Sequence, residues 1–72
     1  MSMIQDGDMV RWKLGHGFAM GMVEEIYPVK ATCSTDGYET TRHGSVMDPV
    51  LKIMANHGSC IVKLASEVES IH

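Results

Sequence analysis

The side chains best suited to chemistry in this sequence are four histidines and two cysteines. Thiolates and neutral imidazoles are the usual ligands of zinc, and structural zinc sites collect them at short, regular spacings. Here Cys33 and Cys60 stand 27 positions apart, and His16, His43 and His57 each stand beside a glycine in a predicted turn. Because histidines in such turns are usually solvated, we expect no metal site and no cofactor.

The two cysteines are expected to stay reduced. The N-terminal residues show no basic segment followed by an apolar core, so no secretion signal is visible and a cytoplasmic location is expected. Disulfides are rare in that compartment, and the spacing of Cys33 and Cys60 matches no disulfide framework. The sequence therefore predicts buried, unreactive thiols.

Catalysis is not expected. No serine stands in the context of a nucleophile elbow, so triad chemistry lacks support. A chain of 72 residues buries only about 60% of its unfolded surface, which leaves little interior for an enclosed active site. We predict a single domain over residues 1–72, ordered from about residue 6 to 70, that is not an enzyme.

The charge balance disfavours a polyanionic partner. Six basic residues stand against nine acidic ones, for a net charge of -3. Attraction to phosphate drives non-specific nucleic-acid binding, so this balance opposes it. No apolar run is longer than three residues, the length of Phe18-Ala19-Met20, which is far below the length that spans a membrane.

The stretch from Thr41 to Pro49 is the part of the sequence best suited to binding. It is a long polar connection between two predicted strands, and loops on a rigid scaffold commonly carry binding residues. Its turn chemistry also has a structural interpretation, in which Gly44 supplies a positive φ and Arg42 pairs with Asp48 or Glu39. The sequence alone supports both interpretations.

The secondary structure that positions these candidate residues is expected to consist of short strands. Glycine and other turn residues recur about every ten positions, and the runs between them are rich in β-branched and aromatic residues. This pattern is typical of an all-β barrel or sandwich. At the C-terminal end, Ser66 and Glu69 have the spacing of a capping box, which predicts a single helical or 3-10 turn.

The strongest hairpin signal is Asp36-Gly37, the pair favoured in a type I′ turn. Its arms, Thr32 to Thr35 and Tyr38 to Arg42, are mostly polar, so this hairpin should be largely solvated. Another hairpin turns at His57-Gly58, and an even-length loop there would pair Ile53 with Val62 and Leu51 with Leu64. That pairing places Leu51, Ile53, Ala55, Cys60, Val62 and Leu64 together on one inner face.

The first hairpin can be paired in two ways. Either Phe18, Met20 and Met22 share the face of Val10 and Trp12, or Ala19, Gly21 and Val23 do. We prefer the second, with Trp12 over the bare Gly21 and Val10 opposite Val23. Three methionines would then face outward, namely Met20, Met22 and Met54.

A series of short sequence strings is spread over positions 7 to 68, namely Gly7-Asp8-x-Val10-x-Trp12, Gly15-x-Gly17-x-Ala19-x-Gly21-x-Val23, Thr41-Arg42-x-Gly44-Ser45, Asp48-Pro49, Val62-Lys63-Leu64 and Ser66-Glu67-Val68. Together these strings resemble the hypervirulence-associated TUDOR-domain proteins, a group of small SH3-like barrels. The resemblance implies an all-β, five-stranded SH3-like (Tudor-like) barrel with a short C-terminal turn. It implies no particular ligand.

The plasmid-type dihydrofolate reductases are a weaker comparison. They share a Gly-Asp-x-Val start, here Gly7 to Val10, but line their tetrameric pore with a Val-Gln-Ile-Tyr segment that this chain lacks. Tudor-like cages for methylated lysine need several aromatic faces. This chain offers only four aromatic residues, of which Trp12 is predicted to lie in the core.

We therefore expect a small non-catalytic module that binds a protein partner through one end of its barrel. The residues predicted to line that end are Tyr27, Tyr38, Arg42, His43, Ser45 and Asp48. The alternative is a nucleic-acid-binding barrel that uses Arg11, Lys13, Arg42 and Lys63. If Met20 and Met22 are exposed, a homodimer through them is the simplest way to cover them.

Overall fold

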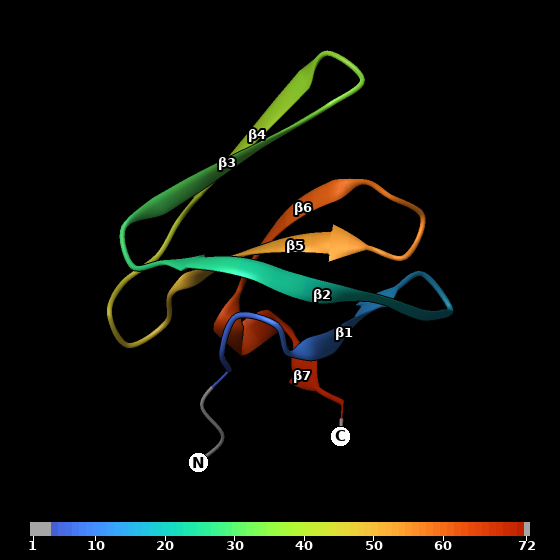
Figure 1. Ribbon diagram of the computed structural model, residues 1–72, viewed down its shortest axis with the longest axis horizontal. Helices are drawn as coiled ribbons and strands as arrows, with labels where there is room; N and C mark the ends of the chain where they lie inside the picture. The colour runs from blue at the N-terminus through green and yellow to red at the C-terminus, as the bar shows by residue number, and fades with distance from the viewer. Residues whose placement is uncertain (1–3, 72) are drawn as a thin grey trace.

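The computed structural model describes residues 4–71 and is all-β, as the sequence predicts (Figure 1). No helix of that range is long and apolar enough to cross a membrane. In chain order the elements are β1 (Met9–Leu14), β2 (Gly17–Tyr27), β3 (Lys30–Thr35), β4 (Tyr38–His43), β5 (Val50–Ala55), β6 (Cys60–Leu64), a 3-10 turn η1 (Ala65–Glu67) and β7 (Glu69–Ser70).

The strands form two antiparallel sheets. The main sheet has the order β6-β5-β2-β1-β7, and β3 pairs only with β4 in a second sheet. In Figure 1 this β3–β4 hairpin lies beside β6 and rises away from the main sheet towards its tip. The expected five-stranded barrel is therefore only partly right, because over residues 4–71 the seven strands do not close into a barrel.

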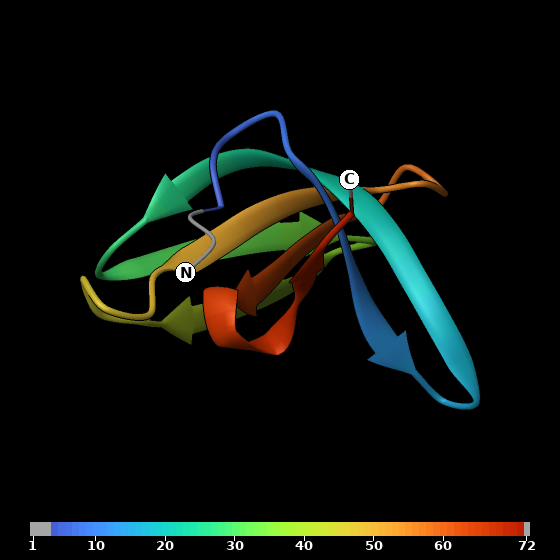
Figure 2. The same ribbon diagram turned by 90° about the horizontal axis from the view of Figure 1, so that it is seen from below.

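Strand β2 is the long, curved centre of the main sheet (Figure 2). Its register with β5 shifts between Val23 and Glu25, and such a bulge bends a strand. Gly21 lets β5 approach closely, since a Cβ there would lie 2.5 Å from the carbonyl oxygen of Met54 and 2.7 Å from Ile53 Cγ2. A larger residue at this position would push the two strands apart.

The inner face of the main sheet holds the larger core cluster. Its buried members are Val10, Trp12, Val23, Leu51, Ile53 and Ala55. Trp12 is only 4% exposed, which confirms its predicted place in the core. The preferred face of the first hairpin is also confirmed, but its pairing is wrong by two residues, because Trp12 faces Ala19 and Val10 faces Gly21.

The outer face of the main sheet carries a second buried cluster, under the β3–β4 hairpin. It contains Ala31 and Cys33 from β3, Val50 from β5 and Val62 from β6. The Asp36-Gly37 turn forms as predicted, with φ of 52° and 82°. Strand β4 is largely exposed, as expected, whereas β3 packs its apolar side onto the sheet.

This second cluster explains why the predicted pairing of β5 with β6 is wrong. Ile53 lies opposite Ile61, and Lys52 lies opposite Val62. The even-length pairing requires a single apolar face, but both faces of β5 are buried, with Leu51 and Ile53 on one side and Val50 on the other. Val62 is therefore covered by the hairpin rather than by the inner core.

The prediction of free thiols is also wrong. Cys33 and Cys60 form a disulfide, with Cα atoms 5.6 Å apart, that ties β3 to β6. Folding of the β3–β4 hairpin over the outer face brings these distant positions together. The prediction of reduced cysteines depends on the absence of a visible secretion signal and takes no account of this packing.

The C-terminal turn forms as predicted, but with a different cap. Glu67 Oε1 accepts the backbone N–H of Leu64 at 2.8 Å, so Glu67 rather than Glu69 closes the turn. Glu69 lies in β7 instead, where its carboxylate pairs with Arg11 at 3.6 Å. The turn thus leads the chain back to the edge of β1.

Candidate interaction surface

The structure brings five of the six predicted binding residues to one end of the domain. Tyr27 ends β2 opposite Val50, and His43 ends β4 opposite Lys30. The backbone N–H of Gly44 donates to the carbonyl of Val29 at 2.8 Å, which joins the end of β4 to the β2–β3 turn. Arg42, Ser45 and Asp48 belong to the same end of the domain.

Tyr38 is the exception. It directly follows the Asp36-Gly37 turn at the hairpin tip, where it is 79% exposed. His43 lies five residues further along β4, about 17 Å away at the usual rise of a strand. Tyr38 and the other predicted residues therefore do not form one surface, and Figure 1 shows the tip and the 44–49 loop at opposite ends of the hairpin.

Residues 44–49, named here the Asp48 loop, form a compact turn. Ser45 and Asp48 exchange backbone hydrogen bonds of 3.1 Å, and the Asp48 N–H also donates to Ser45 Oγ at 3.2 Å. Gly44 does not have the positive φ that we predicted. It is required for space, because a Cβ there would lie 2.7 Å from the Asp48 carbonyl oxygen and 3.0 Å from Val50 Cγ2.

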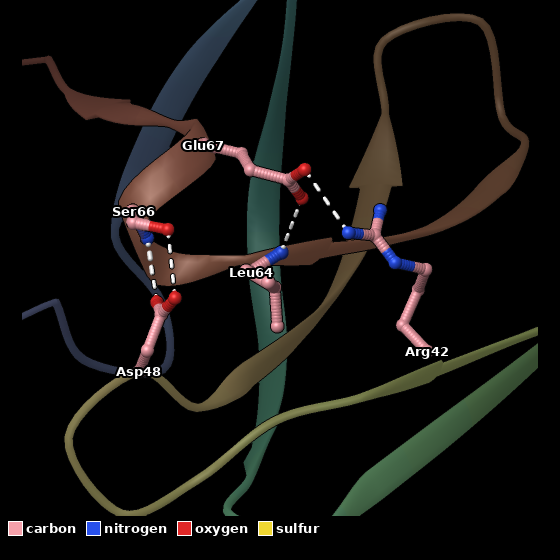
Figure 3. Close-up of polar contacts among 5 residues, drawn as sticks. All are labelled: Arg42, Asp48, Leu64, Ser66 and Glu67. Carbon is pink, nitrogen blue, oxygen red and sulfur yellow. Dashed lines mark hydrogen bonds and ion pairs between the residues drawn. The ribbon is translucent and has the colours of Figure 1, made fainter.

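The Asp48 carboxylate fastens this loop to the 3-10 turn (Figure 3). Oδ1 accepts the Ser66 N–H at 2.8 Å, and Oδ2 accepts the Ser66 hydroxyl at 2.7 Å. Hydrogen bonds to an ionised carboxylate are stronger than those between neutral groups. Both oxygens of Asp48 are thus engaged in structure.

A second contact holds β4 to the same turn. The Arg42 guanidinium donates to Glu67 Oε2 at 3.0 Å, so both partners that we predicted for Arg42, Asp48 and Glu39, are wrong. The hydrogen bond from Arg42, with that from the Leu64 N–H, holds the pKa of Glu67 below its usual value of 4.5. We call Arg42, Asp48, Ser66 and Glu67 the polar clamp.

The clamp leaves an apolar loop tip in solvent. Val46 is 83% exposed and Met47 is 91% exposed, and Val29 lies next to the loop at 68%. His43 is exposed beside them, and Tyr27 is half-buried. The predicted set of binding residues omits Val46 and Met47 because it treats the stretch as polar, although two adjacent apolar residues inside a polar loop are visible in the sequence.

The aromatic residues do not surround a common point. Trp12 is buried, Tyr38 is at the hairpin tip, and Phe18 lies at the far end of β2 from Tyr27. The face of Phe18 is already covered by Arg11, whose guanidinium carbon is 4.5 Å from the ring centroid. A cage for a methylated ammonium group needs several adjacent faces, so this arrangement does not provide one.

Another part of the described surface could hold a small ligand. An open depression of about 300 Å³ is lined by Asp6, Glu24, Glu25 and Ile26, and it includes none of the six predicted binding residues. Within residues 4–71 no group of three or more His, Cys, Asp or Glu side chains is arranged to hold a metal ion. The Asp48 loop thus stands out as the candidate surface, with chemistry suited to contact rather than catalysis.

Comparison with known proteins gives one match. Residues 7–68 match the family described as "Hypervirulence associated proteins TUDOR domain". No curated protein and no solved structure matches the chain significantly.

Proposed function

Because the chain belongs to the family of hypervirulence-associated proteins TUDOR domains, we propose that it is a non-catalytic module that binds a protein partner through the Asp48 loop. Membership of this family indicates a small binding module, and its barrel-like fold is consistent with the two packed sheets. The surface used for binding is our inference from the geometry.

The observation that carries the proposal is the pairing of an exposed apolar tip with a rigid base. Val46 and Met47 project from a loop that the polar clamp ties to the 3-10 turn. A loop already held in one conformation loses little entropy when it binds, which favours affinity. Large apolar side chains in solvent gain free energy when a partner covers them.

The chemistry of this end defines the kind of partner. Val46, Met47 and the neighbouring Val29 offer apolar contacts, and methionine adapts its shape to the surface it meets. Tyr27 and His43 stand at the rim, where a hydroxyl and an imidazole can form hydrogen bonds. The complementary surface is a shallow apolar groove with polar edges on a folded protein.

Site-specific crosslinking tests the proposal. A photoreactive residue placed at Met47 should capture a partner in cells that produce this protein. The matched control is Leu14, which is apolar and 65% exposed at the end of β1, beside the turn of a different hairpin. Capture of a partner from position 47 and not from position 14 supports the proposal, whereas capture from position 14 alone would overturn it.

Nucleic-acid binding remains the alternative, and two ion pairs argue against it. Arg11 lies 3.6 Å from Glu69, and Arg42 lies 3.0 Å from Glu67, so two of the four cations predicted for phosphate contact have carboxylate neighbours. Retardation of oligonucleotides that falls steeply with salt would favour this alternative over the protein partner.

A further inference from the structure

A patch of exposed methionines lies on the outer face of the main sheet. Its members, named here the methionine face, are Met9, Phe18, Met20, Met22 and Met54, and they are between 37% and 56% exposed. Met22 lies directly opposite Met9 on one side and Met54 on the other, so these three form a row across β1, β2 and β5. The outward orientation predicted for Met20, Met22 and Met54 is confirmed.

The β3–β4 hairpin covers only part of this outer face. Met54 of β5 lies opposite Met22, so both point to the outer face. Alternate residues of a strand share a face, so Lys52 and Val50 point outward as well. Val50 is fully buried under the hairpin, whereas Met54 is 37% exposed beyond it. The methionine row is thus the uncovered continuation of a face that is buried elsewhere in the same molecule.

Charges of opposite sign stand on the two sides of the row. Arg11 and Lys13 follow Met9 on β1 and point to the same outer face. On the other side of the row, Glu25 of β2 lies opposite the outward-pointing Lys52. Because of the bulge between Val23 and Glu25, the side chain of Glu25 also points to the outer face. At one end of the face Arg11 is paired with Glu69, which leaves Lys13 as the remaining cation, and at the other end Glu25 shares the face with Lys52.

We propose that a second copy of this chain covers the methionine face, through a two-fold axis that runs along the Met9–Met22–Met54 row. Such an axis lies parallel to the sheet and reverses the direction of the strands in the second copy. The three methionines of each row then meet their equivalents. An interface of this kind uses the same patch on both copies and closes on itself.

The reversal also brings the opposite charges together. Arg11 and Lys13 lie two and four residues from the row, about 7 and 14 Å along the strand, and Glu25 lies about 10 Å away on the other side. After the two-fold rotation the cations on β1 of one copy face the end of β2 that carries Glu25 in the other. Neighbouring strands are about 5 Å apart within a sheet and stacked sheets lie about 10 Å apart, a separation that the long side chains of Lys13 and Glu25 can span from opposite sides.

This charge pattern selects a second copy over an unrelated occupant. Rotation about the axis brings Lys13 of one copy towards Glu25 of the other, so a second copy supplies an opposite charge to each of these two side chains. Methionine side chains are unbranched and repack readily, which suits a surface that must fit itself. The Asp48 loop is a separate surface, so this inference does not depend on the proposed binding function.

Sedimentation equilibrium of the purified chain tests the apolar part of the proposal. The weight-average mass should rise from 7.9 kDa towards twice that value as the concentration is raised to roughly 1 mM. Met22→Lys, which would bury two unpaired ammonium groups near the axis, should weaken association at least about tenfold. The matched control Leu14→Lys, at an apolar residue that is 65% exposed at the end of β1 and points to the other face of the sheet, should leave association unchanged.

A charge exchange tests the two-fold axis itself. Lys13→Glu and Glu25→Lys should each weaken association, and the double variant should recover it because the pair is restored with its signs reversed. A monomer at every concentration overturns the proposal, whatever else covers the face. A dimer that is insensitive to Met22→Lys, or a double variant weaker than both single ones, overturns it as well.

Discussion

Reduction of the disulfide between Cys33 and Cys60 should remove a large part of the stability of this domain. The bond joins positions 27 residues apart, and the chain-entropy relation gives about 3.5 kcal/mol for a loop of this length. A 72-residue domain has a total unfolding free energy of about 4–11 kcal/mol at typical values per residue. The bond is therefore expected to supply at least about a third of the total.

Urea and thermal unfolding with and without a reductant measure this contribution. The reduced chain should unfold about 15–25 °C lower than the oxidised one, given the usual shift per kcal/mol in domains of this size. The Cys33→Ala/Cys60→Ala double variant is the control, because its stability should not respond to the reductant. Equal unfolding midpoints for oxidised and reduced wild type, or two free thiols in unreduced protein, would show that the bond does not stabilise the domain in this way.

Three further predictions concern the clamp and the bent strand. Asp48→Ala removes both hydrogen bonds to the 3-10 turn and should lower the free energy of unfolding, measured in urea, by about 1–2 kcal/mol. If this loss were the same at low and high salt, the contact would not be charge-assisted. Gly21→Ala should lower the free energy of unfolding by about 1–3 kcal/mol, because the new Cβ would collide with β5. The control Gly17→Ala lies in the same strand, where a Cβ meets nothing within 4 Å, and should lower it less. Equal losses would contradict the close approach of β2 and β5. Because the pKa of Glu67 is lower in the folded state than its usual value, its contact contributes stability above that value and loses it as the pH falls through the folded pKa. Urea titrations between about pH 6 and 2 should show this acid loss in the wild type and a smaller loss in Arg42→Gln, and identical profiles would count against the contact.

Local patterns predicted the elements that depend on a few adjacent residues. The Asp36-Gly37 turn follows from the need for positive φ, and the buried place of Trp12 follows from alternation along β1. Both features are decided within a single hairpin. The sequence was therefore sufficient for them.

Features that depend on packing between hairpins were not predictable in this way. The register of Ile53 with Ile61 and the disulfide both result from the β3–β4 hairpin covering a second face of the sheet. A pattern test that assumes one buried face gives the wrong answer when a strand such as β5 is buried on both. Only the placement of Ala31 and Cys33 over Val50 reveals the second face.

The candidate surface shows the same limit. The polar character of the long loop predicts Arg42, Ser45 and Asp48 as binding residues, and the structure places them close together. The partners of Arg42 and Asp48 lie in the 3-10 turn, 25 and 18 residues away, so the sequence could not show that these two residues hold the loop. What the loop offers to a partner is instead its apolar tip.

The proposed function is tested most sharply by the affinity of the captured partner for the intact and altered loop, measured by calorimetry. Val46→Ser/Met47→Ser keeps the polar clamp and removes the apolar tip, so we expect an affinity loss of at least about tenfold. Leu14→Ser should leave the affinity unchanged. An unchanged affinity for the loop variant would show that this domain does not bind its partner through the Asp48 loop.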